Sequence, residues 1–253
     1  MSEDQKVKTG SAEAPLLSII IPAYNEEKRL PDSLSQITAY VQAQSYPIEV
    51  LVVDDGSRDE TAKVVEAVTA EHPFVNVVQN PHRGKGYAVK TGMLRASGRY
   101  LFFGDADLSM PIEEIEKFLP QNLGEYDVAI GSRETPGANR YDEPPLRHLM
   151  GRVFNLLVQL LAVRGFQDTQ CGYKGFRREV ARDLFSAQTM DGFGFDVEIL
   201  FIAQKRGYRM VEVPIEWYHK SSSQVNPVKD TFKMIRDVFQ VRWNDWRGRY
   251  QKE

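Results

Sequence analysis

The sequence has few of the residues from which disulfides and zinc sites are built. It contains one cysteine, Cys171, and four histidines among 253 residues. A lone cysteine cannot form an internal disulfide, and no second cysteine or histidine lies near it in the sequence to complete a zinc site. We therefore expect neither feature, and the composition fits a reducing compartment.

Long apolar stretches and an excess of positive charge are also missing. The longest mostly apolar run, Val153 to Val163, is interrupted by Asn155 and Gln159 and is shorter than the ~20 residues that a spanning helix needs. Residues 1–15 have neither the basic start nor the apolar stretch of a signal peptide, so we interpret them as a flexible lead-in. The net charge of −3 does not favour nucleic acid as a partner.

The sequence does contain a regular alternation of short apolar runs with amphipathic segments. Its hydrophobic fraction of 42% is enough for a large core. Most of the apolar runs are followed by a polar loop and then by a helical pattern, which predicts an α/β fold with a mostly parallel sheet flanked by helices. We place this domain at residues 16–227, with strands expected at 16–21, 48–53, 75–78, 100–103, 126–130 and 209–213.

Two carboxylates, Asp105 and Asp107, follow one of these apolar runs directly. Strand alternation would send them to opposite faces, so both can reach one ligand only if the backbone turns there. Such a turn lies at the strand's carboxyl end, where open α/β sheets bind ligands. Carboxylates at that place suit Mg²⁺ or Mn²⁺ carrying a diphosphate. A solvated acidic turn has the same local pattern.

Other polar loops follow the neighbouring strands. Right-handed crossovers gather the loops at the carboxyl ends of parallel strands along one edge of the sheet. We therefore expect residues 22–26, the pair Asp54 and Asp55, and Arg133 to converge with Asp105 and Asp107. This expected convergence of polar loops favours a site for a metal and a diphosphate over a solvated turn.

Two helices in the second half have unusually large apolar surfaces. The expected helix 146–163 has only a narrow polar stripe, at Arg152, Asn155 and Gln159, so it is buried or lies on lipid. The segment 228–253 has a net charge of +3 and an apolar stripe at spacings of three and four residues, at Phe232, Ile235, Phe239, Trp243, Trp246 and Tyr250. That pattern is typical of an interfacial helix and also of one that faces a core.

Several motifs, in their order and spacing, resemble the GT-A glycosyltransferases of family 2. They are Pro22-Ala23-Tyr24-Asn25-Glu26, Val53-Asp54-Asp55-Gly56-Ser57, Arg83-Gly84-Lys85-Gly86 and Asp105-Ala106-Asp107. The later segments Asp168 to Phe176 and Phe195 to Glu198 are similar to dolichyl-phosphate glucosyltransferases and their bacterial polyprenyl-phosphate relatives. The resemblance covers about Leu17 to Arg242. It implies a Rossmann-like GT-A domain with C-terminal amphipathic helices.

For the donor, the resemblance implies a nucleotide-diphosphate sugar, UDP-glucose above all, and inversion at the anomeric carbon. It also implies Mg²⁺ or Mn²⁺ held by Asp105 and Asp107. In related mannosyl enzymes a glutamine stands where this chain has Ser109, whose hydroxyl is a weaker ligand. The nucleotide-sugar pocket would further include Pro22, Ala23, Tyr24, Glu26, Asp54, Asp55, Arg83, Lys85 and Ala106.

For the acceptor, the resemblance implies a polyprenyl phosphate at the cytoplasmic membrane face, with the enzyme bound peripherally. A phosphate monoester has a second pKa near ~6, so it is an anionic nucleophile at neutral pH. It needs cations rather than a general base, and arginine forks suit it. Arg133 and Arg147, which flank the polar loop 135–145, are the candidates, with Lys220 as a third.

Some roles stay open at this point. Arg133 could instead pair with Glu134 or Asp127. Asp168, Gln170 and Asp196 would line the sugar pocket, and with a phosphate acceptor the two aspartates would position sugar hydroxyls or hold Arg147. If the acceptor were a hydroxyl of a glycolipid or polysaccharide, Asp196 would be the natural general base. A third alternative is a catalytically idle nucleotide-sugar-binding protein.

Overall fold

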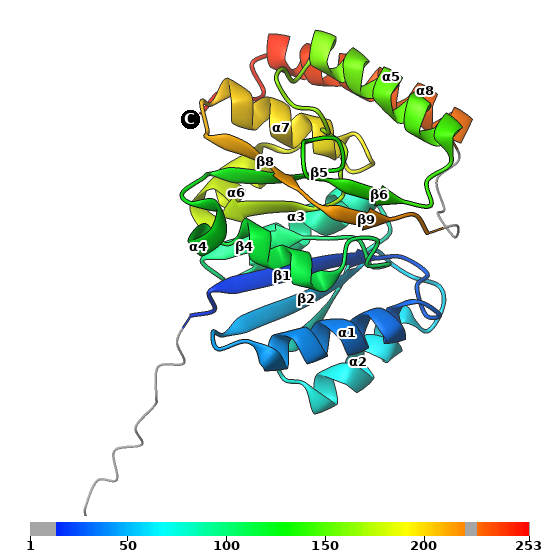
Figure 1. Ribbon diagram of the computed structural model, residues 1–253, viewed down its shortest axis with the longest axis vertical. Helices are drawn as coiled ribbons and strands as arrows, with labels where there is room; N and C mark the ends of the chain where they lie inside the picture. The colour runs from blue at the N-terminus through cyan, green and yellow to red at the C-terminus, as the bar shows by residue number, and fades with distance from the viewer. Residues whose placement is uncertain (1–13, 221–226, 253) are drawn as a thin grey trace, which may run out of the picture.

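The computed structural model describes residues 14–220 and 227–252, and helices cover both faces of its central sheet (Figure 1). The sheet has seven strands in the order β3-β2-β1-β4-β7-β5-β8. The sequence therefore predicted the α/β class and the mostly parallel sheet correctly. Residues 1–13 of the predicted lead-in and the serines at 221–223 lie outside the described residues.

The parallel half of the sheet follows the predicted apolar runs closely. Strands β1 (Leu17–Ala23), β2 (Ile48–Asp54), β3 (Val75–Gln79) and β4 (Tyr100–Phe103) are parallel, and Ile19 is in register with Val50 and Phe102. Strand β1 is apolar at almost every position because both of its faces are covered.

Alternate residues of these strands face two separate clusters of buried side chains. Ile19 and Ile21 pack with α1 (Leu30–Ala43), α2 (Thr61–Glu71) and the 3₁₀ helix η1 (Ile112–Phe118). Ile20 packs on the opposite face with α3 (Lys85–Arg95), α6 (Arg178–Ala187) and α7 (Phe195–Lys205). The two-residue period of the strand thus assigns neighbouring isoleucines to different layers.

One central strand was not predicted. Strand β7 (Lys174–Arg177) lies antiparallel between β4 and β5 (Val128–Ser132), and β8 (Met210–Pro214) completes the sheet. With only four residues, two of which are Lys174 and Gly175, β7 has no alternating pattern from which a strand could be inferred. Its place between two strands supplies the hydrogen-bond partners that both need.

The region predicted as a polar loop, 135–145, also contains a strand. Strand β6 (Asn139–Tyr141) pairs in parallel with β9 (Glu216–Tyr218) in a separate two-stranded sheet, and the short helix α4 (Pro120–Leu123) precedes β5. The polar loop was predicted without this strand, because β6 is stabilised by a partner about 75 residues away rather than by local sequence.

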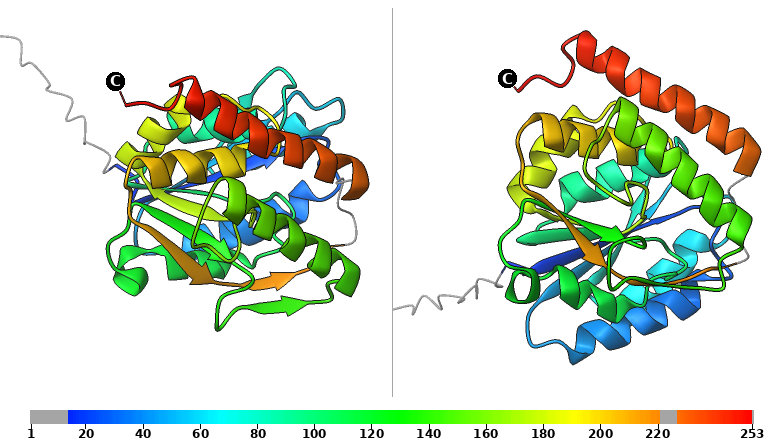
Figure 2. Two further views of the ribbon diagram at one scale, coloured as in Figure 1. Left: turned by 90° about the horizontal axis from the view of Figure 1, so that it is seen from above. Right: turned by 45° about the horizontal axis from the view of Figure 1, so that its top comes forward.

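Helices α5 (Pro145–Leu161) and α8 (Pro227–Trp246) lie side by side at one end of the molecule (Figures 1 and 2). Along α5 an outward stripe is 57–70% exposed, made of Leu146, Leu149, Val153, Leu156 and Leu160. On α8, Phe239, Trp243 and Trp246 are similarly exposed. Among the described helices, none has the length and apolarity that crossing a membrane requires.

The structure corrects which residues of the two predicted stripes face outward and which are buried. Asn155 is buried rather than part of a polar surface, and its side-chain amide donates to the main-chain oxygen of Gln167 at 2.7 Å. On α8 the predicted apolar stripe mostly faces outward, whereas Val238 and Val241 face the core. Tyr250 is also buried, and the side chain of Phe232 lies outside the described residues.

The end of α8 is fixed to α7 by a buried carboxylate. Glu198 is 0% exposed and accepts hydrogen bonds from the backbone of Thr189 at 3.1 Å and of Met190 at 2.9 Å. The Tyr250 hydroxyl donates to the same carboxylate at 2.6 Å. A buried carboxylate with these donors ties the chain end to the loop at 189–190.

Tyr250→Phe removes one donor to this carboxylate. We expect a loss of about 2 kcal/mol in the free energy of unfolding, because a hydrogen bond to a buried charged group is broken. Urea denaturation followed by circular dichroism measures the loss. The control Tyr218→Phe removes an exposed hydroxyl and should cost less than ~0.5 kcal/mol. Equal losses in the two variants would show that Tyr250 does not anchor α8.

Candidate active site

The backbone turns directly after β4, as the sequence predicted. The Gly104 amide donates to the Ile20 carbonyl at 3.0 Å, and Leu108 has a positive φ of 47°. The Oδ1 atom of Asp107 accepts a hydrogen bond from the Ser109 amide at 2.9 Å. Asp105 and Asp107 are both partly exposed on this turn.

Asp105 lies between a lysine and a glycine. Lys85, at the start of α3, places its Nζ 2.5 Å from Asp105 Oδ1. Burial disfavours the charged form of Lys85, but the charges of Asp105 and Asp196 raise its pKa above the usual value. On the other side, a Cβ added to Gly172 would lie 2.2 Å from Asp105 Oδ2. A side chain at position 172 would therefore require the Asp105 carboxylate to move.

The turn has two carboxylates, Asp105 and Asp107, as ligands for a divalent cation. No cluster of three or more His, Cys, Asp or Glu residues is found within residues 14–220 and 227–252. A bound ion would take further ligands from water and a diphosphate, an arrangement that Mg²⁺ commonly adopts. Two accessible carboxylates on one turn fit such an ion. Ser109 orients Asp107 through its backbone amide, and its carbonyl accepts from the Tyr218 amide at 2.8 Å.

The loops after β1 and β3 meet next to this turn. Pro22 and Ala23 end β1, and the Ala23 carbonyl accepts from the Asp55 amide at 2.9 Å. The Tyr24 ring stacks on His82 with centroids 4.1 Å apart. Glu26 forms an ion pair with Arg29, whose Nε is 2.7 Å from Glu26 Oε2.

The two aspartates at the end of β2 already have partners within the protein. Asp54 Oδ1 accepts from the Ser57 amide at 3.1 Å. Asp55 accepts from His82 Nδ1 at 2.8 Å and from the amides of Arg83 and Gly84 at 3.0 and 2.8 Å. Asp55 thus organises the loop at 82–84, a contact set that the sequence did not indicate.

Arg83 extends from that loop toward the chain beyond α6. Its Nε is 3.0 Å from the Asp191 carboxylate, and its guanidinium lies 4.2 Å from the centroid of the Tyr87 ring. The predicted residues of the donor side therefore lie on adjacent loops of one sheet edge. Their contacts with a nucleotide remain predictions.

A second group of predicted residues lines a pocket of about 100 Å³. Arg133, Arg147, Asp168 and Gln170 are all found there. Lys220 is exposed after β9 and is not among the lining residues. The pocket is also lined by residues to which the sequence assigned no role in the site, namely Glu134, Arg140, Glu143, Gly151, Arg152, Asn155 and Gln167. Four arginines thus face one small volume.

Arg133 pairs with Asp168, and not with Glu134 or Asp127. Its Nε and Nη2 atoms lie 2.7 and 3.0 Å from the two carboxylate oxygens, in a bidentate fork. Burial opposes ionisation of Asp168, but the charge and hydrogen bonds of Arg133 lower its pKa to about 2. The guanidinium also lies 5.3 Å from the centroid of the Trp217 ring.

Glu134 pairs with two of the pocket arginines and with His148. Its carboxylate pairs with Arg140, with His148 Nε2 at 3.0 Å and with Arg152 Nη1 at 3.2 Å. Arg140 also donates to the Arg133 carbonyl at 3.0 Å and pairs with Glu143. The four-residue spacing of His148 and Arg152 on the predicted helix was a signal that could have indicated a shared partner.

Asp196 has a partner that the sequence did not indicate. The fully buried Lys174 places its Nζ 2.6 Å from Asp196 Oδ1. Asp168 and Asp196 were considered as holders of Arg147, but in the described part of the chain they pair with Arg133 and Lys174. Lys174 lies inside the segment that carried the family resemblance, yet its type alone gave no reason to expect a buried ion.

The loop at 168–172 connects the two groups of residues. Asp168 and Gln170 line the arginine pocket, the Gln170 amide donates to Asp168 Oδ1 at 3.3 Å, and Gly172 contacts Asp105. A donor held at Asp105 and Asp107 and an anion held at Arg133 would therefore lie at opposite ends of one short loop. This arrangement suits transfer of a group between two phosphate-bearing molecules.

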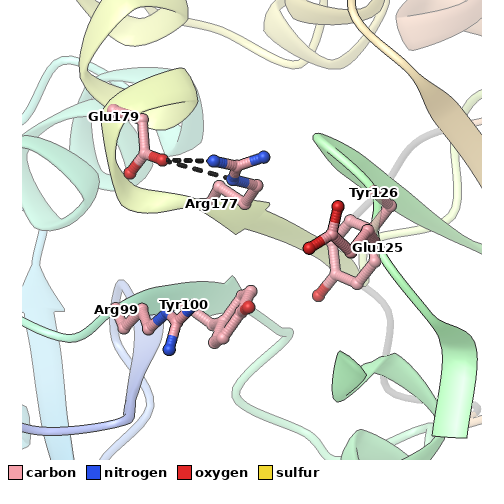
Figure 3. Close-up of a pocket in the computed structure, with 6 residues that line it drawn as sticks. All are labelled: Arg99, Tyr100, Glu125, Tyr126, Arg177 and Glu179. Carbon is pink, nitrogen blue, oxygen red and sulfur yellow. Dashed lines mark hydrogen bonds and ion pairs between the residues drawn. The ribbon is translucent and has the colours of Figure 1, made fainter. Parts of the chain in front are cut away.

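Another pocket of about 100 Å³ lies away from this site (Figure 3). It is lined by Arg99, Tyr100, Glu125, Tyr126, Arg177 and Glu179, and Arg177 Nη2 pairs with Glu179 at 2.8 Å. Tyr100 begins β4 and Arg177 ends the antiparallel β7, so this pocket is at the opposite edge of the sheet from Asp105. Its position excludes it from the carboxylate site.

Comparisons with known proteins show the family of this chain. The model of the family Glycosyl transferase family 2 matches residues 18–185. A dolichyl-phosphate beta-glucosyltransferase of Drosophila melanogaster is 37% identical over 242 residues, which are 89% of this chain and 74% of the relative. The Homo sapiens protein of the same name is 32% identical over 259 residues, 94% of this chain and 78% of the relative.

A solved structure supports the fold. Glucosyl-3-phosphoglycerate synthase from Mycobacterium tuberculosis, in complex with Mn²⁺, uridine diphosphate and phosphoglyceric acid, superposes with a TM-score of 0.66 at 20% sequence identity. The match covers 94% of this chain and 80% of that chain. The GT-A-like arrangement predicted from the motifs is thereby confirmed.

The ion pair of Arg133 and Asp168 predicts an acid-dependent loss of stability. The folded-state pKa of Asp168, about 2, lies below its ordinary value of 3.8, so the pair stabilises the fold above pH ~4 and loses this effect as the pH falls toward 2. The loss should be about 2 kcal/mol. Denaturant unfolding between pH 5 and pH 2 measures it. A variant with both Arg133→Met and Asp168→Asn should lack this component, and an unchanged pH dependence in that variant would contradict the assignment.

Proposed function

Since this chain belongs to Glycosyl transferase family 2 and is a glycosyltransferase, we propose that it moves a hexose from a nucleotide-diphosphate sugar to a polyprenyl phosphate. The donor is UDP-glucose, and the reaction inverts the anomeric carbon. Relatives at 32–37% identity are named dolichyl-phosphate beta-glucosyltransferases, which supports the sugar and the acceptor.

The observation that carries this proposal is the position of the arginine pocket at the base of an apolar helix. Arg147 and Arg152 reach the pocket from α5, while Leu146 and Leu149 on the same helix face outward. A polyprenyl phosphate has an anionic head and an apolar tail. Helix α5 offers a cationic pocket for the head and, within one turn, an exposed apolar stripe for the tail.

The chemistry follows from the charges on the two substrates. The acceptor phosphate is largely dianionic at neutral pH, so one of its oxygens attacks the anomeric carbon without prior loss of a proton. The new carbon–oxygen bond forms as the bond to the diphosphate breaks, and UDP leaves with that electron pair. Arg133 and Arg147 hold the attacking phosphate in place.

Charge develops on the departing diphosphate at the other end of the loop at 168–172. Asp105 and Asp107 would hold a divalent cation, which would supply electrostatic stabilisation of that charge. The ammonium of Lys85 pairs with Asp105 on that turn. On the donor side, the stacked pair of Tyr24 and His82 provides a flat surface near the loop proposed to bind the nucleotide.

The proposed acceptor requires the enzyme to work at a membrane surface. The outward stripes of α5 and α8 lie on neighbouring helices at one end of the molecule (Figure 2). The segment 228–253 has seven basic and four acidic residues, and its positive charge favours anionic lipid headgroups. We place the enzyme peripherally on the cytoplasmic face, with Trp243 and Trp246 in the interface.

Asp107→Asn tests the donor side. We expect at least a hundredfold loss of transfer from UDP-glucose to a short polyprenyl phosphate in the presence of Mn²⁺, because a bound cation contributes several kcal/mol to this kind of reaction. Chromatography of the lipid-linked sugar measures the product. The control Asp32→Asn, which changes an exposed aspartate of α1, should have full activity.

Two outcomes would contradict the proposal in different ways. If the wild-type protein forms no lipid-linked sugar with UDP-glucose, the proposed reaction is wrong, and a panel of other nucleotide sugars then tests the sugar separately. If wild type is active and Asp107→Asn retains full activity with EDTA present, the metal role of Asp107 is wrong.

Membrane binding is tested with Trp243→Glu and Trp246→Glu combined. Each exposed tryptophan that enters a lipid interface contributes on the order of 2 kcal/mol, so binding to anionic phospholipid vesicles should fall at least tenfold. Co-sedimentation measures the bound fraction. The control Lys63→Glu makes the same change in net charge on α2, which lies at the opposite end of the molecule (Figure 1). Equal effects in both variants would indicate a charge effect rather than docking.

A further inference from the structure

Lys174 is a fully buried charged group near the site, with 0% exposure. It comes from β7, the antiparallel strand between β4 and β5. Its Nζ donates to Asp196 Oδ1 and to the Cys171 carbonyl, both at 2.6 Å, and lies 5.5 Å from the centroid of the Phe103 ring. Such an ammonium is stable in a core only because these partners compensate its charge and its hydrogen bonds.

Asp196 is fixed in place from two directions. It is buried in the first turn of α7, where the positive end of the helix dipole favours a carboxylate. The ammonium of Lys174 is in direct contact with it. Asp196 Oδ1 is therefore committed to a partner within the fold.

Lys174 also connects Asp196 to the carboxylate turn through the backbone. The carbonyl that it holds belongs to Cys171, and the next residue, Gly172, is the one that leaves no room for a Cβ beside Asp105 Oδ2. A displacement of the Cys171 carbonyl would therefore move the chain that contacts Asp105. The contacts run without a gap from α7 through Lys174 and Gly172 to the candidate metal turn.

We propose that Lys174 is a positioning residue that fixes the chain at 171–172 against Asp105 and holds Asp196 as a structural partner, not as a general base. This inference rests on the proposed function, since it concerns the reaction proposed for this site. A phosphate monoester is an anionic nucleophile at neutral pH and needs no general base. A lipid or sugar alcohol needs one.

Three variants separate positioning from base catalysis: Asp196→Asn, Lys174→Met, and the two combined. Asp196→Asn keeps an oxygen for Lys174 and should retain kcat with a polyprenyl phosphate within about tenfold, because no proton has to be accepted. Lys174→Met leaves Asp196 without its cation and the Cys171 carbonyl without its donor. We expect it to lower kcat at least a hundredfold while the KM for the phosphate acceptor changes little, since Arg133 and Arg147 are intact.

The combined variant completes a double-mutant cycle and decides between the two roles. Replacing both charges removes the uncompensated carboxylate, so kcat should recover at least tenfold relative to Lys174→Met. A base at position 196 would give the opposite pattern, with a loss of at least a hundredfold in Asp196→Asn and no recovery in the combined variant. That pattern would overturn the inference. Lys205→Met, which breaks an ion pair with Asp245 at the far end of α7, is the matched control and should leave kcat unchanged.

The test does not depend on every variant folding. If Lys174→Met is unfolded by circular dichroism, the kcat of Asp196→Asn alone still decides whether residue 196 acts as a base. A separate measurement with a long-chain alcohol as acceptor should give no product with wild type, and product formation would overturn the inference. If wild type transfers to neither acceptor, the proposed function fails instead, which separates the two failures.

Discussion

The carboxylate of Asp105 is the point on which the arrangement of the site depends. It lies between the ammonium of Lys85, supplied by α3, and the backbone of Gly172, supplied by the loop before β7. These two contacts join residues that are 20 and 67 positions apart in the sequence. The position of the turn after β4 relative to the arginine pocket is therefore decided by packing around one side chain.

Two buried ion pairs hold the other side of the site. Arg133 and Asp168 form a bidentate pair, and Lys174 pairs with Asp196 beside the core. Buried pairs contribute little to net stability compared with apolar side chains of the same size, but breaking one is costly. Their value here is geometric, because each pair fixes one end of the loop at 168–172. The same loop thus positions an anion pocket and a metal turn.

The surface of the molecule agrees with the chemistry of the site. Helix α5 has arginines on the side that faces the pocket and leucines on the side that faces outward. Helix α8 packs next to it, and its end is fixed through Tyr250 and Glu198 to the loop at 189–190. That loop continues to Asp191, the partner of Arg83. The helices proposed to contact lipid are thus connected to both substrate sides.

Apolar periodicity predicted the class of fold and the parallel strands, and the rule that loops after parallel strands share one edge predicted where the turn with Asp105 and Asp107 lies. Both signals are local or topological, so they can be read from a chain. The roles of Arg133, Arg147, Asp168 and Gln170 were expected from the family resemblance, and the structure brings these four residues to one pocket. The position of β7 between β4 and β5, the pairing of Asp196 with Lys174 and the burial of Asn155 became known from the folded structure. Those features depend on which charges and strand edges meet across long separations, and such partners leave no periodic signal in the sequence.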